Sequence, residues 1–291
     1  VPFTAGGGVD AVARLLADKL RVAFKQPVVV DNKPGASGML GAQAVVKAPA
    51  DGYTLLLGSA GETAINPFVY KGRMAYAPEK DLAPITLVTR VPNVMVVSPN
   101  FPAKNIDEFV AHARKNPGKV SYSSSGVGNP QHLNGELLED VAGIFMIHIP
   151  YKGASGQLID VTTGVVDATF VSYAAARPFI QGGKVKAIAV TSAKRASFAP
   201  EIPAIAETKA LAKYQLENWF GLFAPAKVPA DVVRRINADI NEALRSKDVA
   251  EKFAGQGADP YPTQPQEFGA ILRADIAKWG AVVRASGATV D

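Results

Sequence analysis

The sequence predicts an α/β protein of two lobes, each with a parallel-type sheet covered by helices. Strand-like and helix-like segments alternate through residues 1–61, and the same alternation returns through residues 101–216. This order favours parallel strands with helices on the faces of the sheet. With 291 residues, 48% of them hydrophobic, the chain is long enough to build two domains with full cores.

The elements of the first part follow from the spacing of apolar residues. Val12, Leu16 and Leu20 recur at helical spacing with charged residues opposite, so this segment predicts an amphipathic helix. Short apolar runs bounded by turn residues predict strands. In order, we expect a helix at 10–24, a strand at 27–30, a turn at 32–35, a helix at 38–47, a strand at 53–57 and a turn at 58–61.

The second part repeats this pattern, and two helices then close the chain. The closing helices carry apolar stripes that begin at Val232 and Phe268, and Gly287 is the expected C-cap of the last one. Before them we expect helices at 106–115, 130–142, 154–163 and 173–180, and strands at 119–122, 145–149, 167–171 and 185–190.

Two long apolar stretches, residues 85–97 and 219–225, fit inside neither lobe. We expect them to cross between the lobes, one outward and one returning, which makes a natural hinge. Lobe one is then discontinuous, with residues 1–95 plus 222–291, and lobe two comprises residues 96–221.

Two Gly-rich turns, each of which opens a helix, indicate a binding site for a small anion. The first is residues 2–10, PFTAGGGVD, and the second is residues 123–130, SSSGVGNP. A helix N-terminus exposes unpaired N–H groups and the positive end of its dipole, and glycines let a ligand approach that backbone. Two such turns in similar segments predict two lobes that face one anion.

Other function classes find little support. The net charge of +5 comes from scattered Lys and Arg residues rather than from a basic patch, which argues against nucleic-acid binding. The chain has no Cys, only three His, no HExxH motif and no Gly-x-Ser-x-Gly elbow, so we expect no metal site, no cofactor and no hydrolase. No apolar run reaches 18 residues, so no membrane span is expected. The opening Val1-Pro2-Phe3 without Met suggests a processed or trimmed N-terminus.

A resemblance to a known family extends over nearly the whole chain. The matching segments, in order, are PFTAGGGVDAVAR (2–14), QPVVVDNKPGASGMLGA (26–42), DGYTLLLGSAG (51–61), INP (65–67), DLAPITLV (81–88), YSSSGVGNPQHLNGELL (122–138), PYKG (150–153), GVVDATF (164–170), GKVKAIAVTSAKR (183–195) and WFGLFAPAKVP (219–229). With these segments the chain resembles the Bug family, the extracytoplasmic solute-binding proteins of tripartite tricarboxylate transporters.

The resemblance implies a periplasmic binding protein of the two-lobed type II fold, with two crossover strands. It implies a monomeric receptor that is not an enzyme, that binds a di- or tricarboxylate, an acidic amino acid or an aromatic acid, and that serves a membrane transporter or a sensor after removal of a signal peptide. The implied ligand residues are Phe3, Thr4, Ala5, Gly6, Gly7 and Asp10 in the first turn, Ser124, Ser125, Gly126, Gly128, Asn129 and His132 opposite, Ser59, Ala60 and Gly61 in lobe one, and Tyr151, Gly153, Asp167, Ser172 and Tyr173 in lobe two.

The chain departs from the family pattern at Glu62-Thr63, where relatives carry a small hydroxyl residue and often a histidine. A carboxylate at this position repels an anionic ligand if it faces inward. It can also pair with the amino group of a ligand, or cap the start of a helix.

Two alternative hypotheses for the function stay open: an α/β transferase that uses the same anion site, and a sensor module without a transporter.

Overall fold

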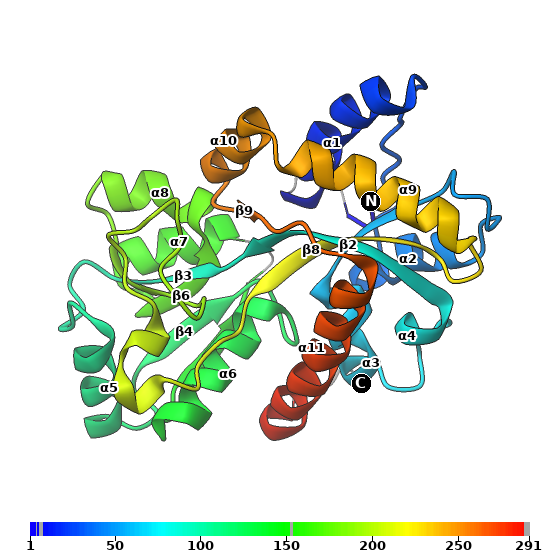
Figure 1. Cartoon of the computed structure of the whole chain (residues 1–291). Helices are drawn as coiled ribbons and strands as arrows, with labels where there is room; N and C mark the ends of the chain where they lie inside the picture. Colours follow the sequence, from blue (N-terminus) through cyan, green and yellow to red (C-terminus); the bar gives the residue numbers. More distant parts are fainter. Residues whose placement is uncertain (4, 6–7, 152–153, 288–291) are drawn as a thin grey trace.

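The computed structural model describes residues 1–3, 5, 8–151 and 154–287. Within them lie two sheets, each covered by helices (Figure 1). The helices are α1 (Gly8–Phe24), α2 (Met39–Val46), α3 (Asn66–Val69), α4 (Pro78–Asp81), α5 (Ile106–Lys115), α6 (Pro130–Ala142), α7 (Ala154–Thr163), α8 (Tyr173–Gln181), α9 (Ala230–Leu244), α10 (Lys247–Gly255) and α11 (Pro265–Ser286). The strands are β1 (Leu56–Ser59), β2 (Leu82–Val91), β3 (Asn93–Val97), β4 (Ser121–Ser124), β5 (Ile147–Pro150), β6 (Ala168–Ser172), β7 (Lys186–Val190), β8 (Asn218–Pro225) and β9 (Asp259–Pro260).

The first sheet has the order β1-β8-β2-β9 and the second has the order β5-β4-β6-β3-β7. We call the first sheet with its helices lobe one, and the second sheet with its helices lobe two. The segment 82–97 leaves lobe one as β2 and enters lobe two as β3, whereas β8 returns to lobe one beside β2. The predicted crossing of the first apolar stretch is therefore observed, while the exact lobe bounds stay a prediction.

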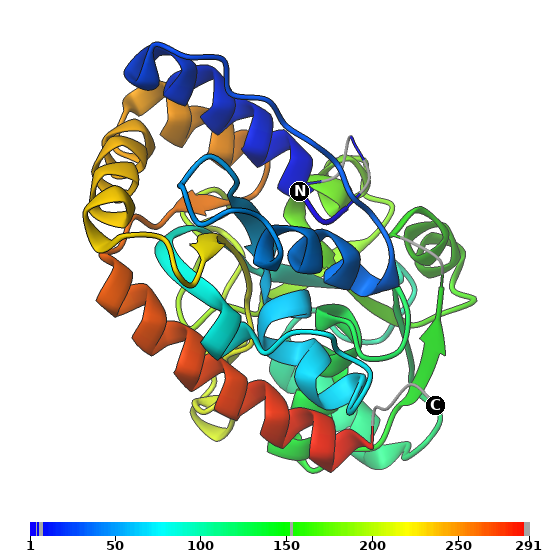
Figure 2. The ribbon, with the colours of Figure 1, turned by 90° about the vertical axis from the view of Figure 1, so that its right-hand side faces the viewer.

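Each sheet has an apolar core on both of its faces. Alternate residues of β8 point to opposite faces of the sheet. Leu222 packs beside α1 and α9, whereas Trp219 and Phe223 pack beside α11. In lobe two, Phe109 and Tyr122 belong to the core under α5 and α6. The core under α7 and α8 lies on the other face. Figure 2 shows α11 running along one side of the molecule, where it contacts lobe one and also α6 of lobe two.

The α/β class with two sheets is as predicted, but the strand directions need a correction. Only β5, β4 and β6 are parallel, and every strand pair of the first sheet is antiparallel. The crossing strands explain this difference, because β2 leaves lobe one in the direction opposite to that in which β8 returns. In lobe two, the crossing strand β3 is likewise antiparallel to both β6 and β7.

The predicted strand at 27–30 is wrong. These residues form no strand, and the Val29 side chain is 83% exposed. A strand requires a partner, and among the described residues no backbone hydrogen bond joins 27–30 to another segment; the nearest such bonds involve Asp31 and Lys33. Val1 N donates to Asp31 O, and Lys33 N donates to Val1 O, both at 2.9 Å. Across the described part of the chain, no helix combines the length and the hydropathy that crossing a bilayer requires.

Candidate functional site

The first Gly-rich turn leads into α1, and its central residues Thr4, Gly6 and Gly7 lie outside the described residues. The base of the turn is held by Asp10, which is buried and accepts two hydrogen bonds from Arg14 at 2.9 and 3.0 Å. Asn32 Nδ2 donates both to Asp10 Oδ1 at 2.9 Å and to the carbonyl oxygen of Phe3 at 3.0 Å. Asp10 therefore positions the turn and does not line the cleft described below.

The second Gly-rich turn connects β4 to α6. Asn129 is the N-cap of α6, because its Oδ1 accepts from the backbone N–H groups of Gln131 and His132 at 2.9 and 3.0 Å. Gly126 and Gly128 have φ values of +129° and +76°, which favour glycine. A Cβ added to Gly128 would also lie 3.0 Å from Val69 of α3, so this glycine permits a close approach between the lobes.

Several backbone N–H groups of the second turn already have partners within lobe two. The backbone N–H of Ser125 donates to Gln131 Oε1 at 2.7 Å, and that of Gly126 donates to Ser124 Oγ at 3.1 Å. The Gly128 N–H donates to His132 Nδ1 at 3.1 Å. Because the oxygen of the Asn129 amide serves as the cap, its NH₂ group remains available as a donor to a ligand.

Two adjoining cavities form a cleft between the lobes, with volumes of about 630 and 280 Å³. They share Asn129, Pro130 and Asn218. Both Gly-rich turns reach the cleft, because Gly8 at the start of α1 and Pro130 at the start of α6 line the larger cavity. Seven of the implied ligand residues line it: Phe3, Ser59, Gly61, Ser125, Gly128, Asn129 and Ser172.

The lining of the cleft is neutral. Of the residues that the structure describes, none with a charged side chain lines either cavity. The polar groups are amides and hydroxyls, from Asn66, Asn93, Gln131, Asn218, Gln256, Ser37 and Tyr70 in addition to the residues implied by the sequence. Such a site, at the N-termini of α1 and α6, can hold an anion through neutral donors and helix dipoles.

Glu62 lies behind this cleft rather than in it. Its side chain is fully buried, and its carboxylate accepts from Ser59 N at 2.5 Å and from Ser59 Oγ at 2.6 Å. Burial raises the pKa of Glu62 to about 7, and the two hydrogen bonds from Ser59 oppose that rise. The sequence left open a direct contact between Glu62 and an amino group of the ligand. In this conformation Glu62 does not make such a contact.

His132 and His148 support the second turn from behind. Their rings stack with centroids 3.9 Å apart, and His148 Nε2 forms a 2.6 Å hydrogen bond with Ser124 Oγ. His132 is buried, and its Nε2 lies 3.2 Å from Glu136 Oε1 while its Nδ1 accepts from Gly128. Both ring nitrogens of His132 are thus occupied within lobe two, and burial lowers the pKa of His148 to about 4.

Three further residues implied by the resemblance do not line the cleft, although Tyr173 lies between the lining residues Ser172 and Ala174. Asp167 lies at the start of β6 and accepts from Ser121 at the start of β4, whereas the cleft is at the opposite ends of these strands. The Tyr151 hydroxyl donates to Asp160, and the Tyr173 ring packs on Phe198 at 5.1 Å. Ala5, Asp10, Ala60, Ser124, Gly126 and His132 are near the turns but do not line the cleft, and Gly153 lies outside the described residues.

Asn93 and Asn218 also line the cleft, although nothing in the sequence analysis singled them out. Asn93 begins β3, where it pairs with Ser172, and Asn218 begins β8, where it pairs with Val91. Both amides therefore lie where the chain passes between the lobes. The sequence signal that could have identified these two residues is an amide side chain at the start of each crossing strand.

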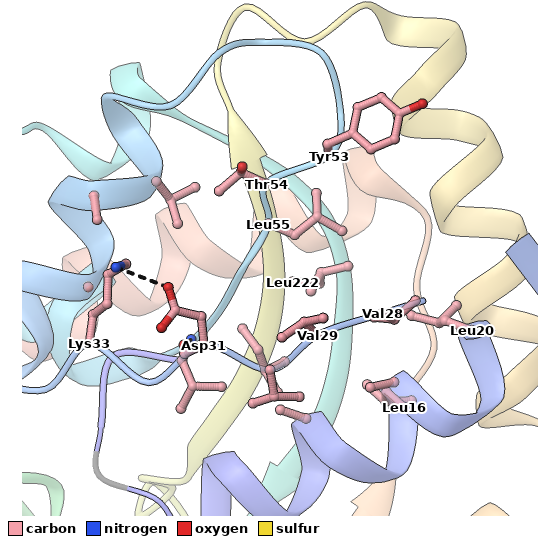
Figure 3. A pocket seen from close by; sticks show the side chains of 18 of the residues that line it. Leu16, Leu20, Val28, Val29, Asp31, Lys33, Tyr53, Thr54, Leu55 and Leu222 are labelled. Carbon is pink, nitrogen blue, oxygen red and sulfur yellow. Dashed lines mark hydrogen bonds and ion pairs between the residues drawn. The ribbon is translucent and has the colours of Figure 1, made fainter. Parts of the chain in front are cut away.

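A separate apolar cavity of about 300 Å³ lies between α1, residues 28–33 and the strand pair β1 and β8 (Figure 3). Its walls are mostly aliphatic, with Leu16 and Leu222 among the lining residues. The charged side chains in its lining, Asp31 and Lys33, pair with each other at 3.0 Å. None of the residues implied as ligand contacts lines it.

Comparison with known proteins agrees with this geometry. Residues 12–288 match the family described as "Tripartite tricarboxylate transporter family receptor". The chain belongs to this receptor family. The resemblance drawn from the sequence is therefore confirmed, and the proteins of this family are solute-binding receptors rather than enzymes.

Three solved structures similar to this receptor share its whole fold. Rpa4515 of R. palustris, solved with adipate, is 35% identical with a TM-score of 0.86, and the match covers 100% of this chain and 97% of that one. MatC from Rhodopseudomonas palustris, with bound malate, is 30% identical with a TM-score of 0.79 and 97% of both chains covered. The periplasmic binding protein BugD is 33% identical with a TM-score of 0.80, over 99% of this chain and 96% of that one.

Proposed function

We propose that this receptor binds a small carboxylate in the cleft between its lobes and delivers it to the membrane subunits of a tripartite tricarboxylate transporter. One observation carries the proposal: the N-termini of α1 and α6 both open onto a cleft whose described lining is neutral. Two helix N-termini aimed at one volume favour a negatively charged ligand. The bound adipate and malate of two relatives support a carboxylate as that ligand.

Neutral donors are sufficient for such a ligand. A hydrogen bond to an ionised acceptor is roughly twice as strong as one between neutral groups. Asn129, Asn218 and Gln131 supply amide NH₂ groups around the cleft. When the lobes close and exclude water, the lower local dielectric strengthens these interactions further.

The arrangement of lobes and contacts is part of the same proposal. The two lobes, with the predicted bounds 1–95 plus 222–291 and 96–221 adjusted so that β3 belongs to lobe two and β8 to lobe one, would move as two bodies about the crossing segments. The contacts from the described residues would be the seven implied residues that line the cleft, together with Asn93 and Asn218. We place the protein in the periplasm, in keeping with BugD, and as a monomer.

A thermal-shift panel tests the proposal. The panel contains adipate, malate, citrate, glutamate and benzoate, with ATP and NAD as unrelated anions. A ligand at 100 times its Kd adds about 2.7 kcal/mol to the free energy of unfolding, which for a protein of this size raises Tm by roughly 5–10 °C. At least one carboxylate should produce this shift. Shifts with ATP or NAD and with none of the carboxylates would contradict the proposal.

A further inference from the structure

The starting observation is the hydrogen bonding of Ser59, which ends β1 and lines the smaller cavity of the cleft. Its hydroxyl donates its proton to Glu62 Oε2 at 2.6 Å, and its backbone N–H donates to Glu62 Oε1 at 2.5 Å. The hydroxyl oxygen also accepts from the Gly61 N–H at 3.2 Å. Ser59 thus stands between the cleft and a buried carboxyl group.

Glu62 is enclosed on all sides by the protein. It has no exposed surface, and a Cβ added to Gly58 would lie 2.7 Å from Glu62 Oε1. No Lys, Arg or His side chain among the described residues forms an ion pair with it. Two other ionisable groups act on it: the Tyr76 hydroxyl, which donates to the Glu62 carbonyl oxygen at 2.7 Å, and the positive amino group of Val1.

The single proton of the Ser59 hydroxyl cannot serve two acceptors. While Glu62 is ionised, this proton is committed to Glu62, and a carboxylate in the cleft meets only the lone pairs of Ser59 with a negative charge behind them. When Glu62 is protonated, its own O–H can donate to Ser59 Oγ. The Ser59 proton is then free to turn toward the cleft and donate to the ligand.

We propose that binding of a carboxylate ligand is coupled to the uptake of one proton by Glu62, which frees the Ser59 hydroxyl to donate a hydrogen bond to the ligand. This inference rests on the proposed function of the cleft. The proton comes from solvent and stays on Glu62, so Ser59 has one proton before and after binding. The ligand keeps its charge, and the pair of Glu62 and Ser59 gains a donor at the cleft.

The energetic cost of this uptake is small near neutral pH. Burial raises the pKa of Glu62 to about 7, so the ligand-free protein is already protonated in part at pH 7.5. An anion in the cleft raises this pKa further, because like charges disfavour the ionised form. A ligand that placed an ammonium group beside Ser59 would have the opposite effect and release a proton, so the sign of the coupling reports the ligand class.

Calorimetry in buffers of different ionisation enthalpy tests the inference. The probe is adipate, or malate if adipate gives no heat, since both are fully ionised at pH 7.5. The wild-type protein should take up on the order of half a proton per ligand at this pH, and its affinity should fall by up to about tenfold per pH unit from pH 7 to 8.5. Glu62→Gln should abolish the uptake, because its NH₂ group donates to Ser59 permanently.

Glu139→Gln is the matched control. Burial raises the pKa of Glu139 to about 7 as well, but its carboxyl group accepts from Met146 N in lobe two and does not line the cleft. This variant should keep the uptake of the wild type. Ser59→Ala should bind more weakly and take up less of a proton than the wild type at pH 7.5 while Glu62 remains in place, because only the like-charge effect of the ligand on Glu62 persists.

The outcomes separate the inference from the function on which it rests. Adipate or malate binding without proton uptake, with proton release, or with an uptake that survives in Glu62→Gln would overturn the coupling and leave the receptor function standing. Binding of no carboxylate from pH 6 to 8.5 would overturn both.

Discussion

The carboxamide of Asn129 has two roles, one in capping α6 and one at the cleft. Its oxygen caps α6 through the N–H groups of Gln131 and His132, and its NH₂ group belongs to a residue that lines both cavities. Asp is as good an N-cap as Asn, but it has no NH₂ group and brings a negative charge. The two roles of Asn129 can therefore be separated by one substitution.

We predict that Asn129→Asp keeps the fold and loses the ligand. The Tm of the ligand-free protein should stay within about 2 °C of the wild type, since the cap is retained. Affinity for the carboxylate should fall by roughly 30-fold or more, because a donor to an ionised group is worth about 1.5–3 kcal/mol and repulsion is added. Asn105→Asp, at the N-cap of α5, is the control and should bind normally in the same titration.

The stability of the ligand-free protein should depend on pH through Glu62. Its pKa is about 7 in the folded protein and near 4.5 as the unperturbed value, so the folded state holds the proton more tightly. Stability then falls as pH rises from 4.5 through 7, by roughly 2–3 kcal/mol for a fully buried group. Glu62→Gln should remove this loss. Urea unfolding at pH 5 and pH 8 measures it, and equal pH dependence in both proteins would refute the burial argument.

The helices could be predicted from the sequence, because their i, i+4 apolar stripes are local patterns. Strands depend on partners that lie elsewhere in the chain. The run Val28–Val30 has the composition of a buried strand, yet it lines a cavity instead of pairing. Likewise β5, whose predicted segment 145–149 is mostly apolar, is half-exposed at a sheet edge. The antiparallel pairing in the first sheet follows from the direction of the crossing strands. A local sequence pattern does not reveal this direction.

The site was predictable to the extent that it consists of turns. Ser125, Gly128 and Asn129 belong to a motif with clear turn and capping residues, and they line the cleft. Asn93 and Asn218 join it only because two strands cross there. Asp167 does not line the cleft, because it lies at the opposite end of β6.

Close packing of α11 on β8 provides a test at the scale of elements. A Cβ added to Gly221 would lie 2.1 Å from Phe268 Cζ, in the core beside Trp219. Gly221→Ala should therefore destabilise the protein by about 1–3 kcal/mol through overpacking. Gly255→Ala, in α10 with no atom within 4 Å of the added carbon, should be neutral or stabilising by up to about 1 kcal/mol. Equal effects in chemical denaturation would show that this packing is not tight.

For the whole molecule, the two crossing segments make ligand-driven closure the expected motion. The ligand stabilises whichever arrangement brings both helix N-termini closest to it. The absence of Cys from the sequence makes this motion accessible to site-specific dyes. Val22 in α1 and Val165 in lobe two are each 69% exposed and lie far from the cleft lining.

We predict that saturating carboxylate shifts the Val22→Cys/Val165→Cys protein toward a single inter-dye distance, measured by single-molecule energy transfer. In the ligand-free protein the distribution should be broader or displaced, because the two lobes exchange between arrangements. A pair placed within lobe one, Val22→Cys/Tyr53→Cys, is the control and should not respond. An identical distribution with and without bound ligand would argue against closure.

A carboxylate between the N-termini of α1 and α6, held by neutral groups, can be tested by a crystal structure of the protein with adipate or malate. We predict one carboxylate group of the ligand within hydrogen-bond distance of Asn129 Nδ2 and of the turn before Gly8, with Glu62 still bonded to Ser59. A ligand in the apolar cavity beside Leu16 and Leu222, or a carboxylate paired with a Lys or Arg side chain, would contradict it.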